Sequence, residues 1–71
     1  MAQAILYVDG LSSERSAGAV NEALKSLDGV QSVVIDIEQK KARVNFDPIK
    51  VQPERMKWAV RQQGFAARPW L

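Results

Sequence analysis

The sequence predicts an α+β fold in which four strands and two helices follow the order β-α-β-β-α-β. Three observations predict it: two segments with the apolar spacing of amphipathic helices, four short runs rich in β-branched and aromatic residues, and turn residues between them. Right-handed crossovers in both βαβ halves give a four-stranded antiparallel sheet with both helices on one face. This is the ferredoxin-like sandwich, and residues 1–71 are expected to form it as a single domain.

The first strand and the first helix meet at a glycine and a group of serines. Residues 4–8 are β-branched and aromatic-rich and form the strand, which ends at Asp9-Gly10. Ser12 or Ser13 is expected to cap the helix, with Ser16 at the third helical position if Ser13 is the cap. The buried stripe of this helix is Val20, Leu24 and Leu27, with Ala17 and Ala23 beside it.

Two strands in the middle of the chain are expected to form an antiparallel hairpin. Asp28-Gly29 ends the first helix, while Gly18 within it is expected to allow close packing against the sheet. Residues 30–37 alternate as the second strand, residues 38–40 turn the chain, and residues 41–46 form the third strand. The inward residues of the third strand are Ala42, Val44 and Phe46.

The last part of the chain predicts a second helix and a short strand. Pro53 suits the first turn of the helix, and Gly64 ends it. Residues 65–68 form the last strand until Pro69 breaks it, which leaves Trp70 and Leu71 as a tail. The apolar face of the second helix is Met56, Ala59 and Val60.

The composition excludes several classes of function. The chain has no cysteine and no histidine, which excludes disulfides, thiol nucleophiles, histidine bases and Ser-His-Asp triads, so we expect no enzyme and no catalytic residue. The ligands of soft and borderline metals are missing as well. A net charge of +2 does not indicate nucleic-acid binding. No apolar run is long enough to span a membrane and the start lacks a signal peptide, so a cytoplasmic location is expected.

The same residues resemble the heavy-metal-associated domain family, which contains small metallochaperones and the N-terminal domains of copper- and zinc-pumping P-type ATPases. In that family the first strand runs into Gly-Met-Thr-Cys-x-x-Cys, followed by Ala-x-x-Val and a Leu four residues later. The corresponding frame here is Gly10-Leu11-Ser12-Ser13-Glu14-Arg15-Ser16, then Ala17, Val20 and Leu24. Further matches are Gly29-Val30, Ala42-Val44-Phe46 before Asp47-Pro48, and Ala59-Val60 before Gly64-Phe65.

The resemblance implies a metal loop whose two ligand positions have lost their sulfur. The family holds Cu(I), or Zn or Hg, through two cysteine thiolates, and those positions are Ser13 and Ser16 here. A serine hydroxyl is a hard oxygen that stays protonated at neutral pH, so no cofactor and no tight binding of copper, zinc, cadmium or mercury are expected.

Four neighbouring positions are expected to support the shape of this loop. Leu11 replaces the family's methionine, and Phe65 falls where bacterial members often carry a tyrosine near the metal. The supporting residues are Gly10, Leu11, Ser12 and Phe65.

Three origins of the paired serines remain open. Serine is the nearest isostere of cysteine, and an experimenter substitutes it to silence a metal site while keeping its shape. A naturally degenerate domain kept for binding another protein is the second origin. A designed or consensus-like sequence is the third.

Two classes of function therefore compete. The first is the metallochaperone lineage, for which the resemblance implies a metal-transporting ATPase or another heavy-metal-associated domain as partner and a monomer or weak dimer as state. The alternative is a metal-independent interaction module that uses the outer sheet face or the helix carrying Trp58. The outer face would carry Ile5, Tyr7, Val34, Arg43 and Asn45. A loosely basic side is formed by Lys40, Lys41, Lys50, Arg55, Lys57 and Arg61.

Overall fold

The computed structural model describes the backbone of residues 2–70 and the side chains of residues 2–67. The predicted order of strands and helices is confirmed. The elements are β1 (Ala2–Asp9), α1 (Glu14–Lys25), β2 (Val30–Asp36), β3 (Lys41–Phe46), α2 (Pro53–Gln62) and β4 (Ala66–Trp70).

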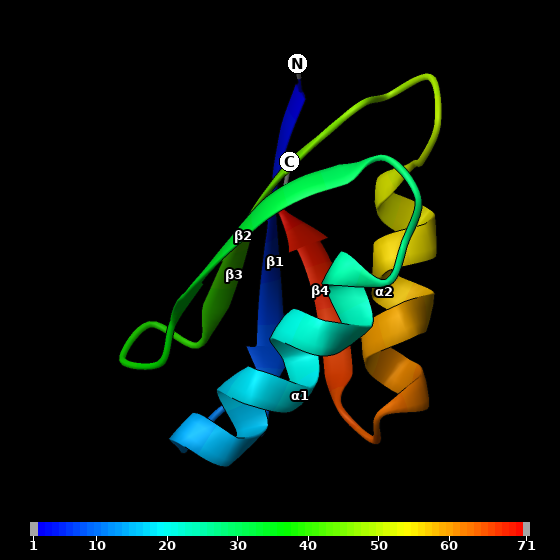
Figure 1. The fold of residues 1–71 in the computed structure, drawn as a ribbon. Coiled ribbons are helices and arrows are strands. Elements are labelled where there is room, and N and C mark those ends of the chain that lie inside the picture. The colour runs from blue at the N-terminus through cyan, green and yellow to red at the C-terminus, as the bar shows by residue number, and fades with distance from the viewer. Residues whose placement is uncertain (1, 71) are drawn as a thin grey trace.

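All four strands join one antiparallel sheet with the order β2-β3-β1-β4 (Figure 1). Both helices cover the same face of this sheet, with α1 over β2 and α2 over β4. The β2–β3 hairpin is confirmed, and its turn places Lys40 at a φ of 56°. The fold class is therefore the ferredoxin-like sandwich that the sequence predicts.

One hydrophobic core lies between the sheet and the two helices. Leu6 and Val8 point into it from β1, while Ile5 and Tyr7 on the other face are half-buried. Alternation in β3 places its three predicted inward residues in the core. The helices and the loops contribute Leu11, Val20, Leu24, Val51, Met56 and Val60.

The first helix ends earlier than predicted. We expected α1 to continue through Leu27, but Lys25 is its last residue and Ser26 is its C-cap. The Ser26 hydroxyl donates to the carbonyl of Ala23 at 2.7 Å, which satisfies an acceptor that a longer helix would bond with a backbone N–H. Leu27 still packs against the core from the turn that follows.

The last strand extends past the residue that we expected to break it. β4 runs through Pro69 to Trp70, and Pro69 lies opposite Leu6 of β1. β4 is an edge strand and pairs with β1 on one side only. It therefore tolerates a proline, because no second strand requires a backbone N–H from that residue. Trp70 is thus paired backbone rather than tail, and its side chain lies outside the described residues. The second strand was predicted to include Ile37, which is also wrong, since β2 ends at Asp36.

Gly29→Ala is expected to lower the free energy of unfolding by about 1–3 kcal/mol. Gly29 has a φ of 102°, and a Cβ added to it would lie 2.7 Å from the Cβ of Lys50. Gly18 is the matched control: its expected packing against the sheet is wrong, because a Cβ there would meet nothing within 4 Å. Gly18→Ala should therefore stabilise α1 by about 0.5–1 kcal/mol. Urea denaturation measures both, and equal effects of the two substitutions would contradict the assignment of strain to Gly29.

Candidate functional site

The loop between β1 and α1 is held in shape by one glycine and two apolar side chains. Gly10 has a φ of 90°, and a Cβ added to it would lie 3.4 Å from Cδ1 of Phe65. The ring of Phe65 therefore lies against the start of the loop. Leu11 follows, and its side chain is completely buried. Its backbone N–H donates to the carbonyl of Val8, with 3.4 Å between nitrogen and oxygen. The loop is thus anchored by the ring of Phe65 against Gly10 and by the burial of Leu11 in the core.

The serines of the loop cap the first helix. Ser13 is the N-cap, and its Oγ accepts a hydrogen bond from the backbone N–H of Ser16 at 3.2 Å. The two hydroxyl oxygens of Ser13 and Ser16 lie 3.1 Å apart, within hydrogen-bonding distance. Ser12 precedes the cap and is exposed. Of the two caps that the sequence allows, Ser13 is the one used, and Glu14 follows it in the first turn, where the helix dipole favours an anion.

This arrangement suits helix capping better than soft-metal binding. Ser13 and Ser16 converge on the same exposed side of the loop, but both offer a hard hydroxyl oxygen. Across residues 2–67, no three histidine, cysteine, aspartate or glutamate side chains lie close enough together to hold a metal ion. The side-chain donors of Ser13 and Ser16 are therefore hydroxyl oxygens rather than thiolates.

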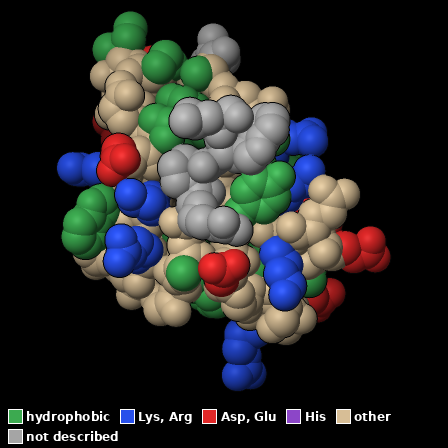
Figure 2. Space-filling model, turned by 180° about the vertical axis from the view of Figure 1, so that it is seen from behind, with side chains coloured by type: hydrophobic (Ala, Val, Ile, Leu, Met, Phe, Trp, Pro, Cys, Tyr) green, Lys and Arg blue, Asp and Glu red, His purple; other side chains and the backbone are tan. Residues whose placement is uncertain are grey.

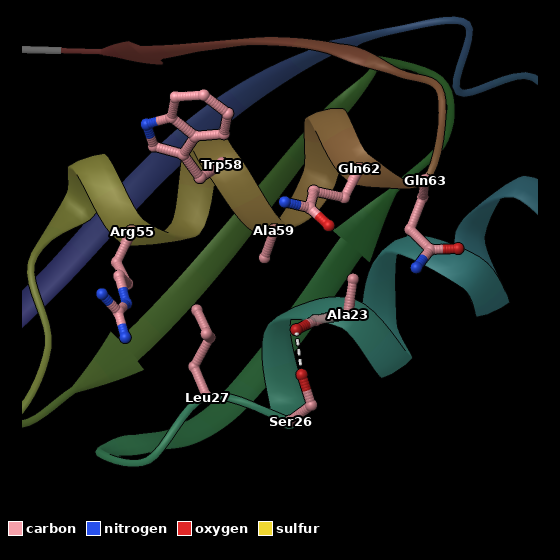
Figure 3. A pocket seen from close by; sticks show the side chains of 8 residues that line it. All are labelled: Ala23, Ser26, Leu27, Arg55, Trp58, Ala59, Gln62 and Gln63. Atoms are coloured by element: carbon pink, nitrogen blue, oxygen red, sulfur yellow. Dashed lines mark hydrogen bonds between the residues drawn. The ribbon is translucent and has the colours of Figure 1, made fainter.

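A second feature is a groove between α1 and α2, which the sequence did not reveal (Figure 3). Its volume is about 520 Å³. Trp58 on its rim is 57% exposed, and the Arg61 guanidinium carbon lies 5.8 Å from the centroid of its ring. We call this the interhelical groove; its lining residues are Ala23, Ser26, Leu27, Arg55, Trp58, Ala59, Gln62 and Gln63.

The outer sheet face is a mixed surface rather than an apolar patch. Val34 is 57% exposed, but the amide of Asn45 donates to Ser32 at 2.8 Å and accepts from Gln3 at 3.4 Å. Arg43 is exposed next to them. Seen from behind the view of Figure 1, hydrophobic side chains lie interspersed with Lys and Arg (Figure 2). Among the described side chains of this face, Arg43 of β3 lies between Val34 of β2 and Ile5 of β1.

The predicted basic side is not a single surface. Lys40 and Lys41 lie at the β2–β3 turn, whereas α2 packs over β4 at the other edge of the sheet. On α2, Lys57 lies 3.6 Å from Glu54 of the preceding turn. Arg55 lines the interhelical groove, Arg61 lies beside Trp58, and Lys50 lines an adjoining hollow that also includes Arg55. Within residues 2–70, no helix is long and apolar enough to cross a membrane.

Comparison with known proteins places the chain among metal-handling domains. The heavy-metal-associated domain family matches residues 5–66. The copper chaperone CopZ of Staphylococcus epidermidis is 38% identical over 65 residues, which cover 92% of this chain and 96% of that protein. A solved CopZ metallochaperone superimposes with a TM-score of 0.91 at 36% identity, covering 94% of this chain and all of the other.

A P-type ATPase provides a second solved structure of this kind. Its copper-binding domain superimposes with a TM-score of 0.95 at 28% identity and covers all of this chain and 96% of that domain. The family match, the identity to the copper chaperones and the shared fold agree over nearly the whole chain. The protein belongs to the heavy-metal-associated domain family, as a metallochaperone-type domain related to the copper chaperones.

Proposed function

We propose that this domain keeps the shape of the family's metal loop but does not bind a soft metal. The observation that carries the proposal is the pairing of Ser13 and Ser16, whose hydroxyl oxygens lie 3.1 Å apart at the start of α1. These are the positions at which the family carries its two cysteine ligands. Gly10, Leu11, Ser12 and Phe65 are proposed to maintain the loop around them.

The chemistry of the two hydroxyls supports this loss of binding. Cu(I) is a soft ion that prefers thiolates and thioethers, and a neutral hydroxyl supplies neither charge nor a polarizable donor. In addition, the Ser13 oxygen already accepts the N–H of Ser16 as the helix cap. Metal transfer between two such domains is ligand exchange between cysteine pairs, so the loss of both sulfurs removes uptake and hand-over together.

A competition titration tests the proposal. The chain is mixed with Cu(I) and a coloured Cu(I) chelator under anaerobic, reducing conditions, and the chelator's absorbance reports any copper that the protein removes. We expect no removal at micromolar concentrations of protein, and no binding of zinc, cadmium or mercury in matched titrations. A dissociation constant for Cu(I) below about 1 μM, equivalent to about −8.2 kcal/mol, would overturn the proposal.

A second candidate function is a non-enzymatic, metal-independent interaction module. The observation that favours it is the exposure of Trp58 beside the interhelical groove, since Trp is enriched among the residues that carry binding energy at interfaces. We propose a cytoplasmic location for the domain. The related copper chaperone and the copper-binding domain of a P-type ATPase support a partner that is a metal-transporting ATPase or another domain of this family. We propose a monomer or weak dimer for the free chain.

A further inference from the structure

We propose that the interhelical groove binds an acidic amphipathic helix of a partner protein, with Trp58 as the apolar anchor and Arg55 as the receptor for carboxylates. The proposal rests on the second candidate function and specifies the chemistry of the partner. It does not involve Ser13 or Ser16, because neither residue lines the groove.

The floor of the groove has room for apolar side chains of a ligand helix. Ala23 of α1 and Ala59 of α2 contribute only methyl groups to it, and Leu27 extends it toward the end of α1 (Figure 3). A helix that lies along the groove between two helices can insert side chains spaced i, i+3, i+4 and i+7 into it. The shape therefore favours an amphipathic helix.

Trp58 and Arg61 form a ready contact surface on the rim. The indole is 57% exposed although its ring could bury a large apolar area on binding. The Arg61 guanidinium lies over that ring, which restrains both side chains before a ligand arrives. Trp and Arg are the residues most enriched among interface hot spots.

The charges around the groove favour an acidic ligand. Arg55 is the single ionisable side chain among the lining residues, and Arg61 adds a second cation at the rim. Lys57 lies next to the carboxylate of Glu54, so the charges of these two side chains offset each other. A carboxylate of the ligand can accept two hydrogen bonds from the fork of Arg55, whereas a basic ligand would bring like charges together.

The groove continues into a second hollow that enlarges the binding surface. This hollow shares Leu27 and Arg55 with the first and includes Ile49, which is 92% exposed. Besides Arg55, its ionisable side chains are the carboxylates of Asp28 and Glu54 and the ammonium group of Lys50. The ligand's acidic residues should therefore lie beside Arg55 and Arg61, and its apolar residues should continue toward Ile49.

A peptide titration tests this inference. The probe is a blocked peptide of about 14 residues with leucines at i, i+3, i+4 and i+7, glutamates at three of the remaining positions and alanines at the others, which keep its helix propensity high. Its control has glutamine in place of every glutamate. Backbone amide chemical shifts of the protein map the binding surface, and Trp58 fluorescence in a Trp70→Phe background measures affinity. We expect shifts confined to residues 23–28, 49–52 and 54–63, which include the lining of both hollows. The glutamine peptide should bind about tenfold more weakly at low salt.

Charge reversal on the protein provides the matched test. Arg55→Glu should weaken binding of the glutamate peptide by about tenfold or more, because it replaces the carboxylate receptor by a like charge. Arg43→Glu makes the same change on the exposed outer sheet face and should leave affinity unchanged. Trp58→Ala should also weaken binding, which separates the apolar anchor from the charge. Because this variant lacks the Trp58 fluorophore, its affinity is measured from the amide chemical shifts.

Each contrary result overturns a defined part of the inference. Equal binding of both peptides would refute an acidic partner while leaving an interaction role intact. Shifts on the outer sheet face would refute the groove, and concentration-dependent groove shifts without peptide would identify a second copy of this chain as the occupant. Absence of binding by both peptides would refute the inference and leave the copper titration unaffected.

Discussion

Replacing Ser13 and Ser16 together by cysteine is expected to create a tight Cu(I) site, with an affinity at least about 1,000-fold higher than that of the present chain. This gain corresponds to about 4 kcal/mol. The two hydroxyl oxygens already lie 3.1 Å apart on the same side of the loop, so thiols at these positions start close together. Both positions adjoin the N-terminus of α1, whose dipole lowers the pKa of a thiol and favours the thiolate that binds the metal.

The same chelator competition measures the gain, and thermal unfolding supplies an independent readout. Without metal, the double variant should be less stable by about 1 kcal/mol, since a cysteine caps a helix less well than Ser13 does. With Cu(I) at 1,000 times the dissociation constant, binding should add about 4 kcal/mol. Replacing both serines by alanine is the control, which should lose the cap without gaining affinity. A double cysteine variant that binds no more copper than this control would refute the assignment of these positions as the ligand positions.

The sequence predicts the fold well where one local pattern determines the outcome. The alternation of Ala42, Val44 and Phe46 requires one inward face, and all three are buried. Ser13 caps α1 because its side-chain oxygen accepts the N–H of Ser16, which has no partner within the helix. This interaction depends only on residues close together in the sequence. The error at Pro69 arises where longer-range structure decides, because the position of β4 at the sheet edge permits proline. The error at Leu27 has a local cause: the Ser26 hydroxyl donates to the carbonyl of Ala23, which the N–H of Leu27 would otherwise bond in a longer helix.

The candidate sites differ in the same way. The serine loop is contiguous, so the sequence alone predicts its cap and the chemical character of its oxygen donors. The interhelical groove depends on how α1 packs against α2, which brings Ala23 and Ala59 to one surface from positions far apart in the chain. Two alanines and an arginine form no local pattern. Ile49 is 92% exposed, and no local pattern in the sequence predicts that exposure.

Leu11→Ala is expected to lower the free energy of unfolding by about 2–5 kcal/mol, although Leu11 lies in a loop. The sequence predicts it only as a support of that loop, but its side chain is fully buried in the core with Val8 and Val20. Removing it leaves a cavity beneath the turn that carries Ser13. Small domains are stable by about 5–15 kcal/mol in total, so this loss is a large fraction of what holds the fold together.

Two comparisons isolate the role of the Leu11 side chain in urea denaturation. Leu11→Met restores the residue that the family carries and conserves volume, so it should cost less than about 1.5 kcal/mol. Ile49→Ala removes a similar side chain that is 92% exposed and should change stability by no more than about 0.5 kcal/mol. A Leu11→Ala cost as small as that of Ile49→Ala would show that Leu11 is not packed in the core. The expected order, in which the Leu11→Ala variant is far less stable than the Leu11→Met variant, would show that the packing of residue 11 in the core, directly before the serines, stabilises the fold.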